Sequence, residues 1–108
     1  MERRYSKRIR VALKAERISG DNKHGVFIEN ISETGIHMTT SPSKEHMKYT
    51  AGSDVDLRLS LSSGRIISLR CKVRWACVKT PPDGLTDSIG LQILDPPEQY
   101  IELVRSLI

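Results

Sequence analysis

The sequence predicts an all-β fold, a six-stranded antiparallel β-barrel with a C-terminal α-helix and a flexible basic N-terminal arm. Three observations support this class. Apolar and polar residues alternate with a period of two through six segments, turn sequences separate most of them, and only the last dozen residues change to a helical period. An open sheet in a chain of 108 residues would expose two edges, so we expect closure into a barrel with the helix against one opening.

The alternation and the turns between the segments place each strand. The expected strands are Ile9–Ala15, Gly25–Ile31, Ile36–Thr40, Val55–Leu61, Ile67–Cys77 and Ile89–Ile93. The longest has one apolar phase, which we expect in the core, formed by Ile67, Leu69, Cys71, Val73, Trp75 and Cys77. Its other face is polar and basic. Residues 41–53 are expected to form a long loop with about one helical turn, and Pro81 and Pro82 interrupt the chain before the last strand.

The C-terminal segment is predicted to be a helix. Asp95 can cap it, Pro96 can occupy its first position, and Glu98 follows three residues after the cap. One apolar stripe then recurs at helical spacing, formed by Tyr100, Leu103, Val104 and Leu107. We therefore expect a single domain over residues 1–108, with a basic arm at 1–8, the barrel at 9–94 and the helix at 95–108.

The charge is distributed unevenly along the chain. The formal net charge is +4, but residues 1–17 contain seven basic and two acidic residues, whereas residues 81–108 contain one basic and five acidic residues. Guanidinium groups match phosphate oxygens and guanine edges bidentately, so the basic segment suggests a partner that bears phosphates. The alternative interpretation is a solvated segment that keeps the protein soluble.

Several classes of protein are disfavoured. No apolar run approaches the roughly 20 residues that span a bilayer, and the N-terminus does not have the pattern of a secretory signal. Cys71 and Cys77 lie about 20 Å apart on one unbroken strand, too far for a disulfide, and two unpaired thiols agree with a reducing cytoplasm. We expect no metal site, no cofactor and no enzymatic activity, because zinc-ligand spacing and catalytic motifs are missing.

Two local motifs are candidates for ligand binding. Arg4 and Arg8 lie four residues apart just before the first strand, preceded by Arg3. The second motif is the segment Asn30-Ile31-Ser32-Glu33-Thr34-Gly35, where a strand gives way to a turn. Short polar side chains there can face a ligand or bond their own backbone, and Gly35 can adopt a positive φ and let the backbone approach a ligand closely.

In this order and spacing, the two motifs resemble those of the PilZ domain family, bacterial receptor modules for the second messenger cyclic di-GMP. That family has Arg-x-x-x-Arg near its N-terminus, matched here by Arg4 and Arg8, and Asp/Asn-x-Ser-x-x-Gly some 20 to 30 residues later. The second motif is matched by Asn30, Ser32 and Gly35. The resemblance extends over the whole chain and includes Trp75 and the segment Gly90-Leu91-Gln92-Ile93.

The resemblance implies a role for each motif residue. Arg4 and Arg8 would bind guanine and phosphate from a mobile arm, since arginine pairs bidentately with guanine O6 and N7. Asn30 and Ser32 would hold the other guanine and a nearby phosphate, and Gly35 would shape the turn. Asn30 replaces the more frequent Asp and offers both a donor and an acceptor without the negative charge.

Two further residues extend this expected site. In the family, an arginine in the position of Arg3 accompanies binding of an intercalated nucleotide dimer, and the alternative is one more surface arginine. Trp75 lies on the apolar phase, which favours core packing over stacking on a base, and it stays a secondary candidate.

The expected mechanism is an order change driven by the ligand. Phosphates would neutralise the basic arm and fold it across the barrel, which would present a different surface to a downstream protein in motility, biofilm or exopolysaccharide control. Two alternatives stay open. One is a degenerate PilZ-like module that acts only through protein contacts, and the other is a basic small barrel that binds nucleic acid. The second would need an aromatic stacking surface, and the pattern predicts that most of the five aromatic residues are buried or scattered.

Overall fold

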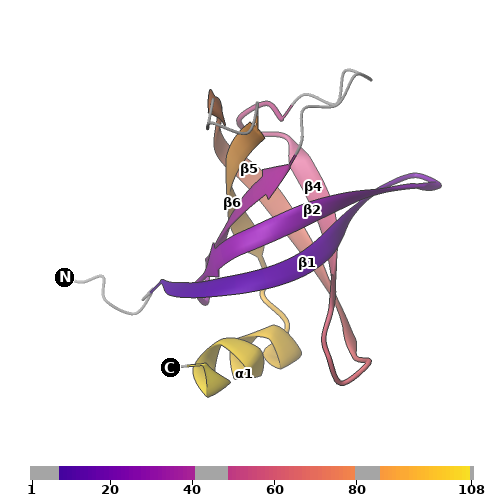
Figure 1. Ribbon diagram of the computed structural model, residues 1–108, viewed down its shortest axis with the longest axis vertical. Coiled ribbons are helices and arrows are strands. Elements are labelled where there is room, and N and C mark those ends of the chain that lie inside the picture. The colour runs from indigo at the N-terminus through magenta and orange to yellow at the C-terminus, as the bar shows by residue number, and fades with distance from the viewer. Residues whose placement is uncertain (1–7, 41–48, 80–85, 108) are drawn as a thin grey trace.

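The computed structural model describes residues 8–40, 49–79 and 86–107. These residues form six strands and one helix, namely β1 (Ile9–Ser19), β2 (Asn22–Ile31), β3 (Gly35–Thr40), β4 (Asp54–Ser60), β5 (Ile66–Lys79), β6 (Thr86–Leu94) and α1 (Glu98–Ser106). All strand pairs are antiparallel, and the sheet closes in the order β1-β2-β3-β6-β5-β4 (Figure 1). The predicted all-β barrel with a C-terminal helix is confirmed.

The barrel consists of two three-stranded meanders joined along both edges. Neighbouring strands in sequence pair within β1-β2-β3 and within β4-β5-β6, and the β3–β6 and β1–β4 pairs close the circle. The β1–β2 hairpin is longer than expected. Its register continues to Ser19 opposite Asn22, because Gly20 adopts a φ of 61° and allows a tight turn.

The alternating apolar residues fill the barrel interior. Every second residue of β4 is buried, at Val55, Leu57 and Leu59, and their β5 partners across the ladder are buried as well. Complete burial of a side chain such as Leu57 stabilises the fold by about 1.5–3 kcal/mol. The period of two therefore determines the core of this half of the barrel.

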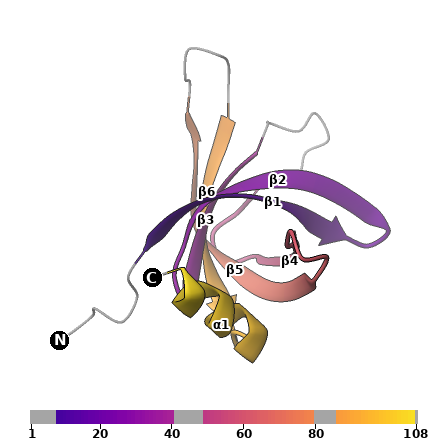
Figure 2. The ribbon, with the colours of Figure 1, turned by 60° about the horizontal axis from the view of Figure 1, so that its bottom comes forward.

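Helix α1 covers one end of the barrel, as expected (Figure 2). Tyr100 and Val104, from the predicted stripe, are buried in the core, whereas Leu107 at the C-cap is 43% exposed.

The predicted start of this helix is wrong. The N-cap is Pro97, without a side-chain cap, and Asp95 has a φ of 50°. A residue before proline is disfavoured in the helical conformation, and this restriction applies to Asp95 and Pro96, so the helix begins only after Pro97.

The end of β5 also differs from the prediction, because Trp75 and Cys77 are exposed rather than in the core. The pairing of β5 with β6 shifts between Val73 and Trp75, so that Trp75 lies opposite Gly90. This β-bulge inserts Arg74 and moves the residues after it to the other face of the strand.

Some predictions fall outside the described residues. These are most of the basic arm, including Arg3 and Arg4, most of the long loop after β3, and the Pro81–Pro82 break. In the part of the chain that is described, no helix has the length and apolar character needed to cross a membrane.

Candidate functional site

Three irregularities in the strand register lie around one region of the barrel wall. They occur in β1 between Arg10 and Leu13, in β2 between Ile28 and Asn30, and in β5 between Val73 and Trp75. In β2 the additional residue is Glu29, so Glu29 and Asn30 are both partly exposed while Ile28 and Ile31 stay buried. The bulge in β2 thus turns two successive polar side chains outward.

The turn between β2 and β3 is built around Ser32. Its backbone N–H donates to the carbonyl of Gly35 at 2.9 Å, and its hydroxyl oxygen accepts the N–H groups of Thr34 (3.3 Å) and Gly35 (3.0 Å). Ser32 is 4% exposed. The hydroxyl also lies 3.5 Å from the Gly35 carbonyl oxygen, which is too long for a strong hydrogen bond.

The reason for glycine at position 35 is different from the expected one. Its φ is not positive, in contrast to Gly20, Gly52 and Gly64. Instead, a Cβ at Gly35 would lie 3.0 Å from the carbonyl oxygen of Leu91. Glycine therefore relieves a tight approach of β3 to β6 at the start of their ladder, where a Cβ would press on this carbonyl.

Two side chains of helix α1 contact this turn at the end of the barrel. The Tyr100 hydroxyl donates to the Ser32 carbonyl at 2.5 Å, and Arg105 contacts Glu33 at 3.3 Å. Burial is the main cause of the raised pKa of Tyr100, so its hydroxyl stays protonated and remains a donor. The helix and the turn form one unit.

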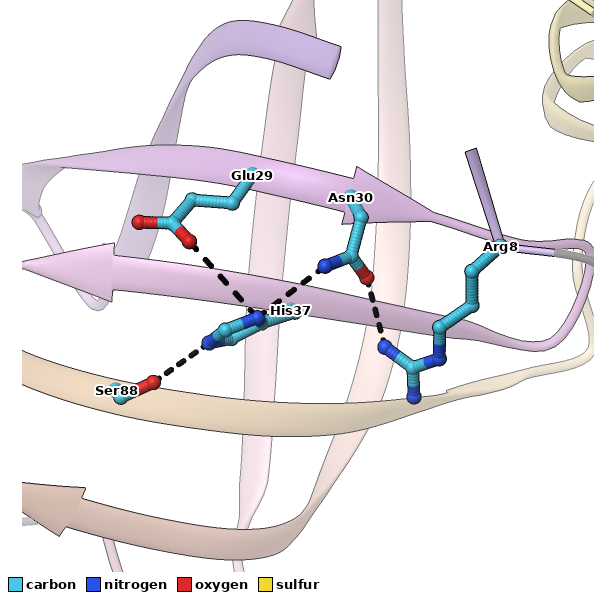
Figure 3. A network of polar contacts seen from close by, with 5 residues as sticks. All are labelled: Arg8, Glu29, Asn30, His37 and Ser88. Atoms are coloured by element: carbon cyan, nitrogen blue, oxygen red, sulfur yellow. Dashed lines mark hydrogen bonds and ion pairs between the residues drawn. The ribbon is translucent and has the colours of Figure 1, made fainter. Parts of the chain in front are cut away.

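A chain of polar contacts runs beside the turn from Arg8, just before β1, across β2 and β3 to β6 (Figure 3). Arg8 donates to Asn30 Oδ1 at 2.7 Å, Asn30 Nδ2 lies 3.3 Å from His37 Nδ1, and His37 Nε2 lies 2.6 Å from the hydroxyl of Ser88. The carboxylate of Glu29 is 4.0 Å from His37 Nδ1. The second arginine of the first motif is thereby brought to the first residue of the second motif, 22 positions later.

Trp75 borders this network on β5. Its indole packs against the backbone of Gly90, where a Cβ would lie 2.2 Å from Nε1 and 2.3 Å from Cε2. The ring centroid of Trp75 lies 5.4 Å from that of His37, and 42% of Trp75 is exposed. Gly90 thus provides a flat backbone surface that keeps an aromatic face near the motif residues.

A pocket of about 430 Å³ joins these elements. Its described lining residues are Arg8, Ser32, Thr34, Gly35, Arg74, Trp75, Leu91 and Gln92. Two of them are arginines and none is acidic, and Arg74 is held by a 3.0 Å hydrogen bond to Gln92. The volume lies within the usual range for small-molecule sites, and the charge favours an anion.

The structure brings together Arg8, Ser32, Gly35 and Trp75 around this pocket, and Asn30 adjoins it through Arg8. Sequence reasoning missed Arg74 as a lining residue, although it belongs to the predicted basic face of its strand. It also missed His37 and Ser88, which no motif indicates because their contacts form only between strands.

A second, larger pocket lies elsewhere on the barrel. It measures about 750 Å³, and it includes Ala15, Val26 and Phe27 but none of the motif residues. The smaller pocket is the candidate site because the motif residues converge on it.

The sequence matches the model of the PilZ domain over residues 2–108. The chain belongs to the PilZ domain family. No curated protein matches this PilZ chain.

Solved structures of PilZ proteins show the same fold. The "PilZ domain with c-di-GMP of YcgR from Escherichia coli" superposes with a TM-score of 0.76 at 11% identity, covering 98% of this chain and 92% of that one. MrkH of K. pneumonia gives 0.79 at 16% identity, covering 99% and 50%. The Bacillus subtilis inhibitor of motility, MotI/DgrA, gives 0.73 at 17% identity, covering 96% and 48%. This PilZ chain therefore spans about half the length of MrkH and MotI.

Proposed function

We propose that this PilZ domain is a receptor for cyclic di-GMP. The observation that supports this most directly is the convergence of both family motifs on one pocket, with Arg8 bonded to Asn30 at its rim. Family membership and the YcgR structure, which contains c-di-GMP, agree with this ligand.

The pocket chemistry suits a molecule with two phosphates and two guanines. The guanidinium groups of Arg8 and Arg74 can neutralise phosphate or pair with guanine O6 and N7. The Ser32 hydroxyl can donate to a phosphate oxygen, and the exposed indole of Trp75 offers a face on which a base can stack. Arg4 would add a second guanidinium from the arm.

The proposed response is closure of the arm over the bound nucleotide. Arg3, Arg4 and Arg8 would share the ligand's phosphates, and a third guanidinium would support an intercalated nucleotide dimer. The new surface would then be recognised by a downstream protein. Slower amide exchange of residues 1–10 after addition of the ligand is expected, and unchanged exchange would exclude closure.

The decisive experiment is a calorimetric titration with cyclic di-GMP. The wild type should bind, and Arg8→Ala or Arg4→Ala should abolish detectable binding. Arg65→Ala is the matched control, because Arg65 is exposed in the β4–β5 turn and does not line the pocket. Two nucleotides per chain in the wild type and one in Arg3→Ala would support the dimer.

Absence of binding by the wild type would refute the proposal and leave the protein-contact alternative. A gel shift with nucleic acid that weakens steeply with salt would instead favour the basic barrel alternative.

A further inference from the structure

The hydrogen bonds of Asn30 determine which end of its amide faces the pocket. A guanidinium has only donors, so the atom that receives Arg8 at 2.7 Å must be the amide oxygen. The amide nitrogen is then the atom that faces His37 Nδ1, at 3.3 Å. The orientation of Asn30 follows from its partners alone.

The same reasoning determines the tautomer of His37. Since Asn30 Nδ2 can only donate, His37 Nδ1 must accept and cannot bear a proton. The ring proton is therefore on Nε2, which donates to the Ser88 hydroxyl at 2.6 Å. Ser88 is 0% exposed, and the Trp75 ring lies against His37 at 5.4 Å, so both the acceptor and the ring plane are held in place.

We propose that His37 is a positioning residue that locks the Asn30 amide with its oxygen toward Arg8 and the pocket. Locked in this way, Asn30 presents an acceptor, as the Asp of other family members would, and its donor end is withheld from the ligand. Resting on the proposed function, this makes Asn30 a reader of the N–H donors of guanine. His37 thus determines guanine specificity without touching the nucleotide.

Protonation of His37 should release this lock. An imidazolium has donors at both nitrogens, so Nδ1 would face the donor end of Asn30, and the amide would have to turn its NH₂ toward Arg8. Glu29 on β2, 4.0 Å from Nδ1, favours the imidazolium, whereas the Arg8 charge beyond Asn30 opposes it. On β6 and β5 the ring contacts the neutral Ser88 hydroxyl and the Trp75 indole. Histidine ordinarily changes charge between about pH 5 and 8, so affinity should fall as the pH is lowered through this range.

The first test needs no ligand. Nitrogen-15 NMR of the imidazole rings in the free protein at pH 8 should show His37 as the Nε2–H tautomer. In Asn30→Asp, the carboxylate offers only acceptors, so the Nδ1 proton should return and His37 should titrate at a higher pH. An Nδ1–H tautomer of His37 in the wild type would overturn the proposal.

The second test is titration with cyclic di-GMP and, as the adenine probe, cyclic di-AMP, at pH 8 and pH 5.5. The wild type should lose about five- to a hundredfold in cyclic di-GMP affinity at pH 5.5, the range expected when a guanine N–H donor is left without its acceptor. His37→Phe should bind more weakly at pH 8, lose the pH dependence and discriminate less between the two nucleotides. His37→Asn, which can place an acceptor near the position of Nδ1, should recover part of the affinity.

The controls separate this proposal from its alternatives. His24→Asn and His46→Asn change the other two histidines and should keep the wild-type pH dependence. Asn30→Asp should bind at both pH values, because a carboxylate needs no orientation. An unchanged pH profile in His37→Phe would overturn the positioning role. If the wild type binds no nucleotide but His37 is the Nε2–H tautomer, the proposed function fails while the lock on Asn30 stands.

Discussion

The two halves of strand β5 have similar sequences and opposite environments. In the first half, Ile67, Leu69, Cys71 and Val73 alternate into the core, and each is at most 3% exposed. In the second half, the same alternation continues to Trp75, which is 42% exposed. Only the bulge at Arg74 separates the two.

This difference shows how the barrel provides both a core and a site. Where the register is unbroken, as between β4 and β5, alternation places Val55, Leu57, Leu59 and their β5 partners inside. Where one residue is added, as at Glu29 or Arg74, adjacent side chains both face outward. The candidate site of this PilZ domain lies on the bulged side of the barrel.

The largest expected effect is on thiol reactivity within β5. Burial raises the pKa of Cys71 to about 12, whereas Cys77 is exposed. At pH 8 the thiolate fraction of Cys71 is then about one in ten thousand, so Cys77 should react with a disulfide reagent at least about a thousandfold faster. One rapid thiol in the native protein and two after unfolding are expected. Cys77→Ser should remove the rapid phase, and equal rates for both thiols would contradict the comparison.

The second largest expected effect is on stability: removing a side chain should cost far more unfolding free energy in the first half of β5 than in the second. Leu69→Ala removes a side chain that is 3% exposed and should lower the free energy of unfolding by about 2–5 kcal/mol. Cys77→Ala, on the exposed half, should change it by no more than about 0.5 kcal/mol. Urea denaturation measures both. A similar loss in the two variants would mean that the strand is packed equally on both sides of the bulge.

The surface beneath Trp75 gives the third prediction. In Gly90→Ala the added methyl group would overlap the indole, so the ring must move away, and affinity for cyclic di-GMP should fall about five- to a hundredfold. Gly25→Ala is the matched control, because a Cβ there meets nothing within 4 Å. Titration measures the affinity, and the fluorescence of Trp75, the single tryptophan, reports the ring's displacement. Unchanged emission and affinity would exclude the contact.

The smallest expected effect concerns the helix beneath the turn. Tyr100→Phe leaves the Ser32 carbonyl without its donor and should lower the free energy of unfolding by about 1–2 kcal/mol. Because the pKa of Tyr100 is raised, its contribution is complete below pH 10, its ordinary value, and is lost as the pH rises further. The variant should therefore lose less stability than the wild type above pH 10. Denaturation at pH 7 and pH 10.5 compares them, and identical pH dependence would exclude this role for Tyr100.

Much of the fold could be predicted from local pattern. Alternation identified all six strands, and the change of period identified the helix, because each pattern matches the geometry of a single element. The start of the helix was mispredicted because the capping pattern at Asp95 competes with the two prolines that follow it, and the prolines prevail.

The site could be predicted only in part. The motif residues near one another in sequence, Ser32 and Gly35, form a turn as local chemistry suggests. The roles of Trp75 and His37 could not be found in this way. A bulge depends on how two strands pair, and the contacts of His37 with Asn30 and Ser88 form with residues of two other strands.

The sequence by itself determined the strand order along the chain, the core residues of β4 and of the first half of β5, and the position of both motifs. These features follow from residue type and spacing. Only the tertiary structure decided which face Trp75 occupies, why position 35 is glycine and how Asn30 is oriented. Those features depend on contacts between strands distant in sequence. One residue added to a strand, such as Arg74, changes which face the next side chain occupies. One donor from a distant residue, such as Arg8, determines how an amide is oriented.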